Sequence, residues 1–144
     1  MSSSDSPQVK FVNEWHEGFK AMNVDVLAKA LHKDFRCITY PRSLNQPDAT
    51  KEEWHERTAM AMGFWTHLER MVHSTIEAPG KVISHYSGKA QTTFGVELNR
   101  EAITIAHIVT DEDGSLKIMQ IEEFVDSKGQ LDSIQALEAG MANK

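Results

Sequence analysis

The chain is poor in the features that anchor secreted and membrane proteins. It holds a single cysteine, Cys37, in 144 residues, so an internal disulfide is excluded and a reducing compartment is the simpler interpretation. Its apolar runs are short, and none approaches the roughly 18 residues that a membrane helix needs. The opening MSSSDSP lacks the basic and apolar regions of a secretory signal. We therefore expect a soluble, cytoplasmic protein with no membrane partner.

Basic clusters are also missing. Lys and Arg total 15 against 21 Asp and Glu, which gives a formal net charge of −6. Because nucleic acids bind mainly to concentrated positive charge, they are not expected partners. The 7 histidines form no H-x-H or H-E-x-x-H pattern, so no metal site is predicted. The chain has no phosphate loop, dinucleotide fingerprint or Ser-His-Asp spacing, and we expect no cofactor.

What the sequence does contain is a second half rich in β patterns. Pro79-Gly80 suits the centre of a type II turn, since proline fixes one φ and glycine accepts the positive φ that follows. The DEDG sequence at 111–114 ends a second hairpin loop with a glycine in the left-handed position. We expect strands over residues 68–78, 81–94, 100–110 and 116–126.

The first half predicts helices. Ser6 can cap a helix that begins at Pro7, and apolar residues at intervals of three and four form one stripe along it. A short second helix and a short strand, residues 35–40, follow before Pro41. The TKEE sequence at 50–53 matches a capping box, which predicts the start of a third helix.

The length suits one domain with its own core. We expect a disordered tip over residues 1–6, a single domain over residues 7–126, and a tail over residues 127–144 that forms a short helix. The tail is open to interpretation as a lid, a dimer contact or a frayed end. Helices followed by four long strands are typical of an α+β fold with helices on one side of a mostly antiparallel sheet.

Three segments together resemble the nuclear transport factor 2-like superfamily, and within it the SnoaL-like and ketosteroid-isomerase-like branch: AMNVDVLAKALHKDFRCITYP, TKEEW and DEDGSLKIMQIEEFVDS. YPRSLNQPDATKEEW is also similar to fungal SnoaL-like proteins. The resemblance implies a cone-shaped barrel, in which a strongly curved, mostly antiparallel mixed sheet carries three N-terminal helices over its concave face. It also implies a pocket between helices and sheet, and a homodimer. Because the superfamily holds cyclases, dehydratases, isomerases and non-catalytic proteins, it does not fix a reaction.

The catalytic residues of the isomerases do not carry over to this chain. The tyrosine of the first helix falls on Trp15, and the oxyanion-hole aspartate falls on Ala106. The general-base aspartate falls on Thr39 or Tyr40, depending on the register of the first strand. A ketosteroid-type isomerisation is therefore not expected.

Alternation along the strands predicts other pocket residues. If Met119 and Ile121 point inward, as the resemblance implies, Glu123 does too. A carboxyl in an apolar cone would have a raised pKa, which suits a general acid or base. The alternative is a solvated rim pair with Glu122, since charged residues are rarely buried unpaired. Tyr40, at the end of the first strand, can donate to a carbonyl oxygen.

Glu123 and Tyr40 are therefore the candidate catalytic residues. The candidate pocket residues are Trp15, Phe19, Arg36, Thr39, Trp65, Ala106, Ile108, Met119 and Ile121. The histidines of three long strands can either converge as a proton relay or lie on the outer face of the sheet; they are His73, His85 and His107.

The leading hypothesis is a cofactor-free cyclase, dehydratase or isomerase that acts on a small apolar molecule, polyketide- or terpenoid-like, by acid–base chemistry. A ligand-binding carrier without catalysis is the first alternative. A dimeric protein-interaction module, with its function on the outer sheet face, is the second. The residues leave open whether the protein is an enzyme.

Overall fold

The computed structural model describes residues 5–143, so the disordered tip expected over residues 1–6 lies largely outside the described residues. The helical segments are α1 (Pro7–Gly18), η1 (Phe19–Ala21), α2 (Val24–Ala28), η2 (Arg42–Leu44), α3 (Lys51–Phe64) and α4 (Ser127–Ala142). The strands are β1 (Leu31–Tyr40), β2 (Ala49–Thr50), β3 (Trp65–Ala78), β4 (Lys81–Thr92), β5 (Glu97–Thr110) and β6 (Leu116–Val125). Across the described part of the chain, no helix has the length and apolar character to cross a membrane.

The helix starts follow local capping chemistry. The Ser6 hydroxyl accepts a hydrogen bond from the Val9 amide, and Pro occupies the first turn of α1. In α3 the Thr50 hydroxyl accepts from the Glu53 amide while the Glu53 carboxylate accepts from the Thr50 amide. Both starts predicted from the sequence are confirmed.

The strands form a mixed sheet in the order β2-β1-β6-β5-β4-β3. Both expected hairpins are present, with φ of 73° at Gly80 and 85° at Gly114. β1 pairs with β6 in parallel, whereas the other neighbours are antiparallel. This pairing starts at Leu31, four residues before the predicted strand, because β6 supplies hydrogen-bonding partners that local sequence does not reveal.

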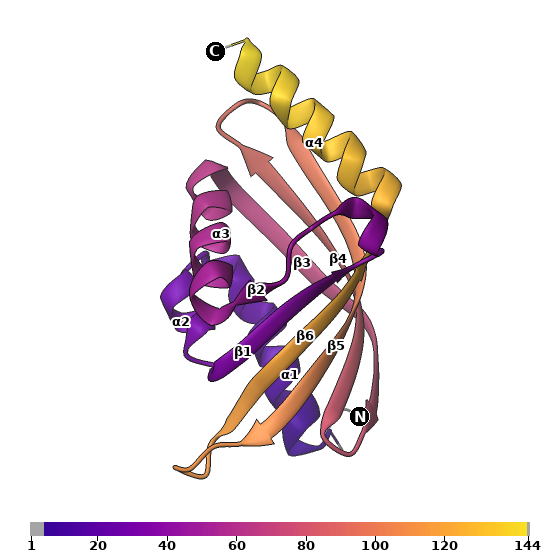
Figure 1. The fold of residues 1–144 in the computed structure, drawn as a ribbon. Coiled ribbons are helices and arrows are strands. Elements are labelled where there is room, and N and C mark those ends of the chain that lie inside the picture. The colour runs from indigo at the N-terminus through magenta and orange to yellow at the C-terminus, as the bar shows by residue number, and fades with distance from the viewer. Residues whose placement is uncertain (1–4, 144) are drawn as a thin grey trace.

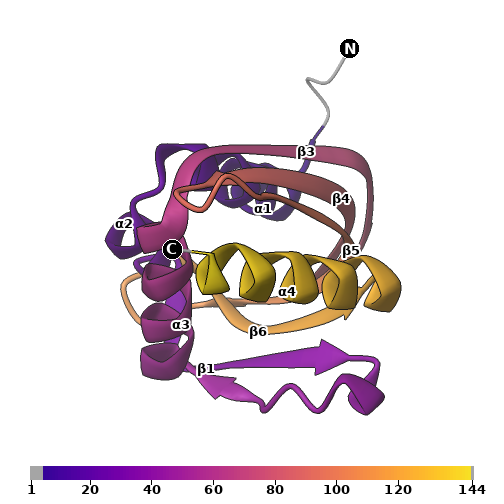
Figure 2. The ribbon, with the colours of Figure 1, turned by 90° about the horizontal axis from the view of Figure 1, so that it is seen from above.

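The sheet curls strongly, and the result is the α+β cone expected from the sequence (Figures 1 and 2). The cone is not closed, since β2 and β3 lie at its edges. Figure 1 shows α1, α2 and α3 on one side of the sheet. The long α4 lies across the end opposite the 111–114 turn, where Ser133 accepts a hydrogen bond from the Asn99 amide of β5.

The main core fills the space between α1–α3 and the concave face. Its buried members are Val9, Val12, Trp15, Phe19, Leu27, Leu31, Phe35, Leu68, Val82, Ala90, Ala106, Ile118 and Ile121. The apolar stripe predicted along α1 thus faces the sheet. Trp15 also donates its ring N–H to the Leu27 carbonyl at 3.2 Å, so its polar edge is satisfied inside the core.

A β-bulge in β6 changes the orientation predicted for one pocket residue, Met119. His107 pairs with Gln120 but Ile108 pairs with Ile118, so Met119 is an extra residue in β6. Ile118 is fully buried, whereas Met119 is only partly buried. The inward placement predicted for Met119 is wrong because the bulge interrupts the alternation that begins again at Ile121.

Candidate functional site

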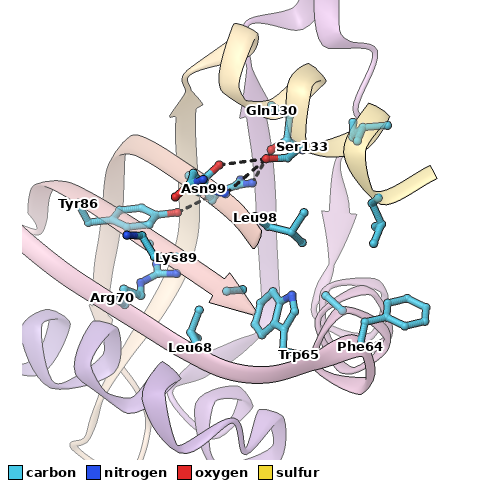
Figure 3. A pocket seen from close by; sticks show the side chains of 16 residues that line it. Phe64, Trp65, Leu68, Arg70, Tyr86, Lys89, Leu98, Asn99, Gln130 and Ser133 are labelled. Carbon is cyan, nitrogen blue, oxygen red and sulfur yellow. Dashed lines mark hydrogen bonds between the residues drawn. The ribbon is translucent and has the colours of Figure 1, made fainter. Parts of the chain in front are cut away.

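A cavity of about 270 Å³ opens between α4 and the strands β3, β4 and β5 (Figure 3). Most of its wall is apolar. The apolar lining residues are Ala61, Phe64, Trp65, Leu68, Ala90, Leu98, Ile134 and Leu137. Such a wall favours a ligand that is mainly hydrocarbon, because burying apolar surface is the largest source of binding energy.

One end of this cavity is polar. Arg70 from β3, Tyr86 from β4 and Arg100 from β5 reach it, together with Gln130 from α4. Cross-strand register explains why they meet. Gly88 pairs with Arg70 on one side and with Arg100 on the other, and Tyr86 lies two residues before Gly88. All three strand residues therefore project from the same, concave face. The site therefore combines an apolar body with a cationic, hydroxyl-bearing end.

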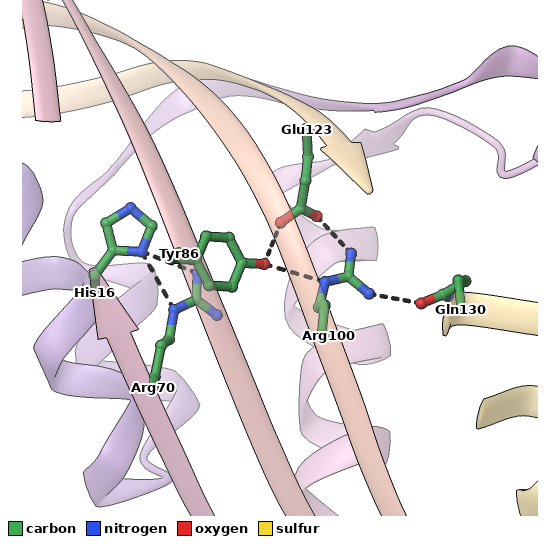
Figure 4. A network of polar contacts seen from close by, with 6 residues as sticks. All are labelled: His16, Arg70, Tyr86, Arg100, Glu123 and Gln130. Atoms are coloured by element: carbon green, nitrogen blue, oxygen red, sulfur yellow. Dashed lines mark hydrogen bonds and ion pairs between the residues drawn. The ribbon is translucent and has the colours of Figure 1, made fainter. Parts of the chain in front are cut away.

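Glu123 lies behind this polar end in a network of hydrogen bonds (Figure 4). Tyr86 donates its hydroxyl hydrogen to one oxygen of Glu123, and Arg100 Nη2 donates to the other at 2.6 Å. Arg100 Nε donates to Tyr86 Oη at 3.1 Å, and its Nη1 donates to Gln130 Oε1 at 3.0 Å. Each guanidinium edge of Arg100 is thus used to fix the carboxylate, the phenol and helix α4.

The charge state of Glu123 differs from the sequence-based prediction. Burial acts to raise the pKa of this carboxyl, but Arg100, the Tyr86 hydrogen bond and Arg70 outweigh burial and hold it below its ordinary value. The predicted raised pKa is wrong because the cone is not apolar around Glu123. This residue is an ionised acceptor at neutral pH, whereas burial raises the pKa of Tyr86 and keeps its hydroxyl protonated.

Arg70 is held by aromatic rings and by His16 (Figure 4). Its guanidinium lies 3.8 Å from the ring centroid of Phe19 and 3.9 Å from that of Tyr86, a cation–π sandwich. Its Nε and Nη2 lie 3.2 Å and 3.0 Å from His16 Nδ1. Burial, followed by the charge of Arg70, lowers the pKa of His16 to about 3. The neutral ring therefore accepts at Nδ1 and carries its hydrogen on Nε2, which faces Thr104 Oγ1 at 3.5 Å.

A second cavity of about 470 Å³ adjoins the first and shares part of its wall. The shared residues are Arg70, Gly88, Lys89, Asn99 and Arg100. The rest of its lining is mostly polar and includes Lys20, Glu69 and Asp126. The cationic end of the apolar cavity is consequently also open to a more polar space.

The predicted pocket residues fall into separate groups. Trp65 lines the apolar cavity. The core holds Trp15, Phe19, Ala106 and Ile121, and Ile108 packs against it. None of these five lines either cavity, although Phe19 contacts the site indirectly through the Arg70 guanidinium.

The first strand separates Tyr40 from Glu123. Thr39 pairs with Glu123 across the parallel β1–β6 ladder and shares its face, which settles the register that the sequence left open. Tyr40 projects from the outer face, stacks on Phe124 at 4.9 Å and donates to Glu122 at 3.4 Å. The expectation that Tyr40 and Glu123 meet in one pocket is therefore wrong.

Two further groups of sequence candidates lie outside the cavities. Arg36 is 53% exposed and pairs with Asp48 at 3.6 Å. His85 and His107 contact Glu101 and Glu122 at 2.6 Å and 2.7 Å. Register places both histidines beside outer-face residues, so they do not converge on the cavity as a relay.

Sequence reasoning missed Arg70, Tyr86, Arg100 and His16. A signal existed for Arg100, because it lies four residues before Thr104, which is buried, and strand alternation places the two on the same face. Tyr86 is a polar aromatic on the same phase of β4 as buried Val82. Neither His16 nor Arg70 stands out locally, since their meeting depends on how α1 packs against β3.

Comparisons with known proteins identify the fold. No family model and no curated protein matches the chain. Solved structures do match. BvnE pinacolase from Penicillium brevicompactum is 16% identical over 90% of this chain and 93% of that one, with a TM-score of 0.78. PrhC from Penicillium brasilianum is 13% identical over 94% and 91%, with a TM-score of 0.80.

A putative SnoaL-like polyketide cyclase from Shewanella putrefaciens is 11% identical over 91% of this chain and 98% of that one, with a TM-score of 0.72. At such identities the likeness shows the fold alone. The chain has the SnoaL-like, ketosteroid-isomerase-like fold that its sequence resembles, and that prediction is confirmed.

Proposed function

We propose that this protein is an enzyme of the cyclase or isomerase kind that binds an apolar small molecule under α4 and rearranges it by proton transfer. The observation that carries the proposal is the Tyr86 hydroxyl at the polar end of an apolar cavity, hydrogen-bonded to ionised Glu123 and Arg100. Proteins of this fold named pinacolase and putative polyketide cyclase support a small-molecule reaction.

The arrangement suits a proton relay. A ligand carbonyl at the polar end lies beside Tyr86 and near the positive charge of Arg70, which stabilises the negative charge that develops on the carbonyl oxygen as a neighbouring C–H bond breaks. The released proton passes to Tyr86 Oη while the phenolic proton passes to the Glu123 carboxylate, so the phenol stays neutral. Return of the proton at another carbon completes an isomerisation without any change in oxidation state.

The test is proton exchange. Apolar ketones are incubated with the protein in D₂O, and loss of their α-proton signals is followed by NMR. We expect the wild-type protein to accelerate exchange and Glu123→Gln or Tyr86→Phe to reduce the rate by about 10²-fold or more, the usual contribution of a positioned acid or base.

The chain offers matched controls for both substitutions. Glu122→Gln changes the neighbouring carboxylate on the outer face, and Tyr40→Phe removes a phenol that contacts Glu122 rather than Glu123. Both controls should exchange at the wild-type rate. Equal rates in Glu123→Gln and Glu122→Gln would refute the relay.

A non-catalytic ligand carrier is the second candidate, and one observation favours it. Both oxygens of Glu123 are engaged, one by Tyr86 and one by Arg100, which is how a static structural ion pair is built. The same experiment separates the two functions. A carrier would bind the ketones without accelerating exchange, and Glu123→Gln would alter only affinity.

A further inference from the structure

The charges at the polar end of the cavity do not balance. Arg100 and Glu123 form an ion pair at 2.6 Å and neutralise each other. His16 is neutral, and Tyr86 keeps its proton. Arg70 forms no ion pair with any residue in the 5–143 range, so its cation is in excess. Burial accordingly lowers the pKa of Arg70, the sign of a charge that has lost solvent.

The hydrogen bonds of Arg70 to His16 use one edge of the guanidinium, and two aromatic rings lie against the group. Phe19 and Tyr86 cover its two faces, and His16 accepts from the edge formed by Nε and Nη2. The remaining edge, formed by Nη1 and the second hydrogen of Nη2, is turned away from His16 (Figure 4). Two parallel N–H groups at this spacing match the two oxygens of a carboxylate.

The position of Arg70 also indicates how a bound ligand would lie in the site. It lines both the apolar cavity and the polar one, so this residue lies where the two cavities share a wall. A carboxylate placed there leaves the rest of its molecule to lie along Leu68, Trp65 and the apolar face of α4. The sandwich and the His16 contacts also hold the guanidinium in place before any ligand arrives, which lowers the entropic cost of binding.

We propose that the ligand of this site is an apolar carboxylic acid, held by a two-point hydrogen bond to the Nη1–Nη2 edge of Arg70. This inference rests on the proposed function for the location of the ligand and names its chemical class. The acid group anchors the molecule at the junction of the cavities, and its hydrocarbon part fills the apolar wall. The reacting carbonyl then lies within the same polar end, beside Tyr86.

Isothermal titration calorimetry with a matched pair of probes tests this anchor. The probes are 2-naphthylacetate and its methyl ester, which share a hydrocarbon body and differ in charge. We expect the wild-type protein to bind the acid about tenfold to hundredfold more tightly, the range given by hydrogen bonds between charged groups. Arg70→Gln should bind both probes with the affinity of the ester.

Further variants separate the anchor from structural damage. Arg70→Lys keeps the charge but has no planar fork, so it should bind the acid more weakly than wild type and still more tightly than the ester. Arg36→Gln removes an exposed arginine on the outer side and should bind like wild type. Retained binding of the ester shows that a variant has kept the cavity. If Arg70→Gln loses binding of the ester, the affinities of Arg70→Lys for the acid and the ester test the anchor instead.

The outcomes distinguish this inference from the proposed function. Equal affinity of the wild-type protein for acid and ester, or a preference that survives in Arg70→Gln, overturns the carboxylate anchor and leaves the proton relay standing. A clear preference for the acid, together with no exchange of ketone protons, supports the carboxylate anchor and refutes the proposed enzymatic function. Binding of neither probe overturns the carboxylate anchor, and the ketone exchange experiment then decides the proton relay by itself.

Discussion

Acid should destabilise this protein through His16. The unfolded chain takes up a proton on this imidazole near its ordinary pKa of 6.5, whereas the folded protein takes it up only near about 3. Between these values the unfolded state binds more protons, so the free energy of unfolding falls as the pH falls. The stabilisation is complete above pH 6.5 and is lost progressively toward pH 3.

The size of the effect follows from the same values. Each pH unit below the ordinary pKa costs about 1.4 kcal/mol, so about 2 kcal/mol is lost by about pH 5. His16 is 1% exposed, and its protonation would place two cations in contact by removing the acceptor that Arg70 uses. Little solvent is present to screen that repulsion.

Urea unfolding, followed by tryptophan fluorescence between about pH 7.5 and about pH 5, measures the loss. Other groups also titrate, so the decisive quantity is the difference between wild type and His16→Gln, whose amide oxygen can still accept from Arg70 but does not titrate. That difference should shrink by about 2 kcal/mol over the range. The same substitution at exposed His67 controls for the loss of an imidazole. A difference independent of pH would refute the neutral, buried His16.

Two other predictions concern assembly and the seat of α4. The homodimer expected from the sequence stays a prediction. Ile103 and Phe124 are adjacent and exposed on the outer face, so they are the candidate dimer contact. Phe124→Arg should therefore lower the mass measured by light scattering to that of a monomer, and an unchanged mass would contradict this contact. A Cβ at Gly140 would lie 2.8 Å from Val96 Cγ2, whereas one at Gly63 would meet nothing within 4 Å. Gly63→Ala should therefore raise the free energy of unfolding by up to about 1 kcal/mol. Gly140→Ala should instead speed amide hydrogen exchange in α4, because the added methyl group would push the helix away from Val96. Equal protection of the α4 amides in both variants would contradict the close packing of α4 against Val96.

Features with a local cause were predictable from the sequence. The helix starts are indicated by Ser6 and Thr50, whose side chains cap nearby amides. The turns are indicated by Gly80 and Gly114, which adopt the positive φ that the turns require. The start of β1 at Leu31 was not predictable in this way. Its hydrogen bonds go to β6, far along the chain, and local propensity carries no information about that pairing.

The site was predictable only in part, for the same reason. Alternation leads to Glu123, which does face the interior of the cone and is 13% exposed. Its hydrogen-bond partners decide its chemistry, and they are Tyr86 from β4 and Arg100 from β5. Without the register Tyr86 and Arg100 cannot be placed beside it, so a solvation argument alone gave the wrong direction for its pKa.

The parallel pairing of β1 with β6 also sets an order of events during synthesis. β1 leaves the ribosome early, but the strand that completes its ladder follows only after β3, β4 and β5 have been made. Until then the edge of β1 that will face β6 stays unpaired, because the two residues of β2 pair with the other edge. The nascent chain must close a long loop before the contact with β6 forms. The hairpins β3–β4 and β5–β6 can form from local contacts first. Because α4 directly follows β6, the cavity gains its cover in the same late step that joins the two halves of the sheet.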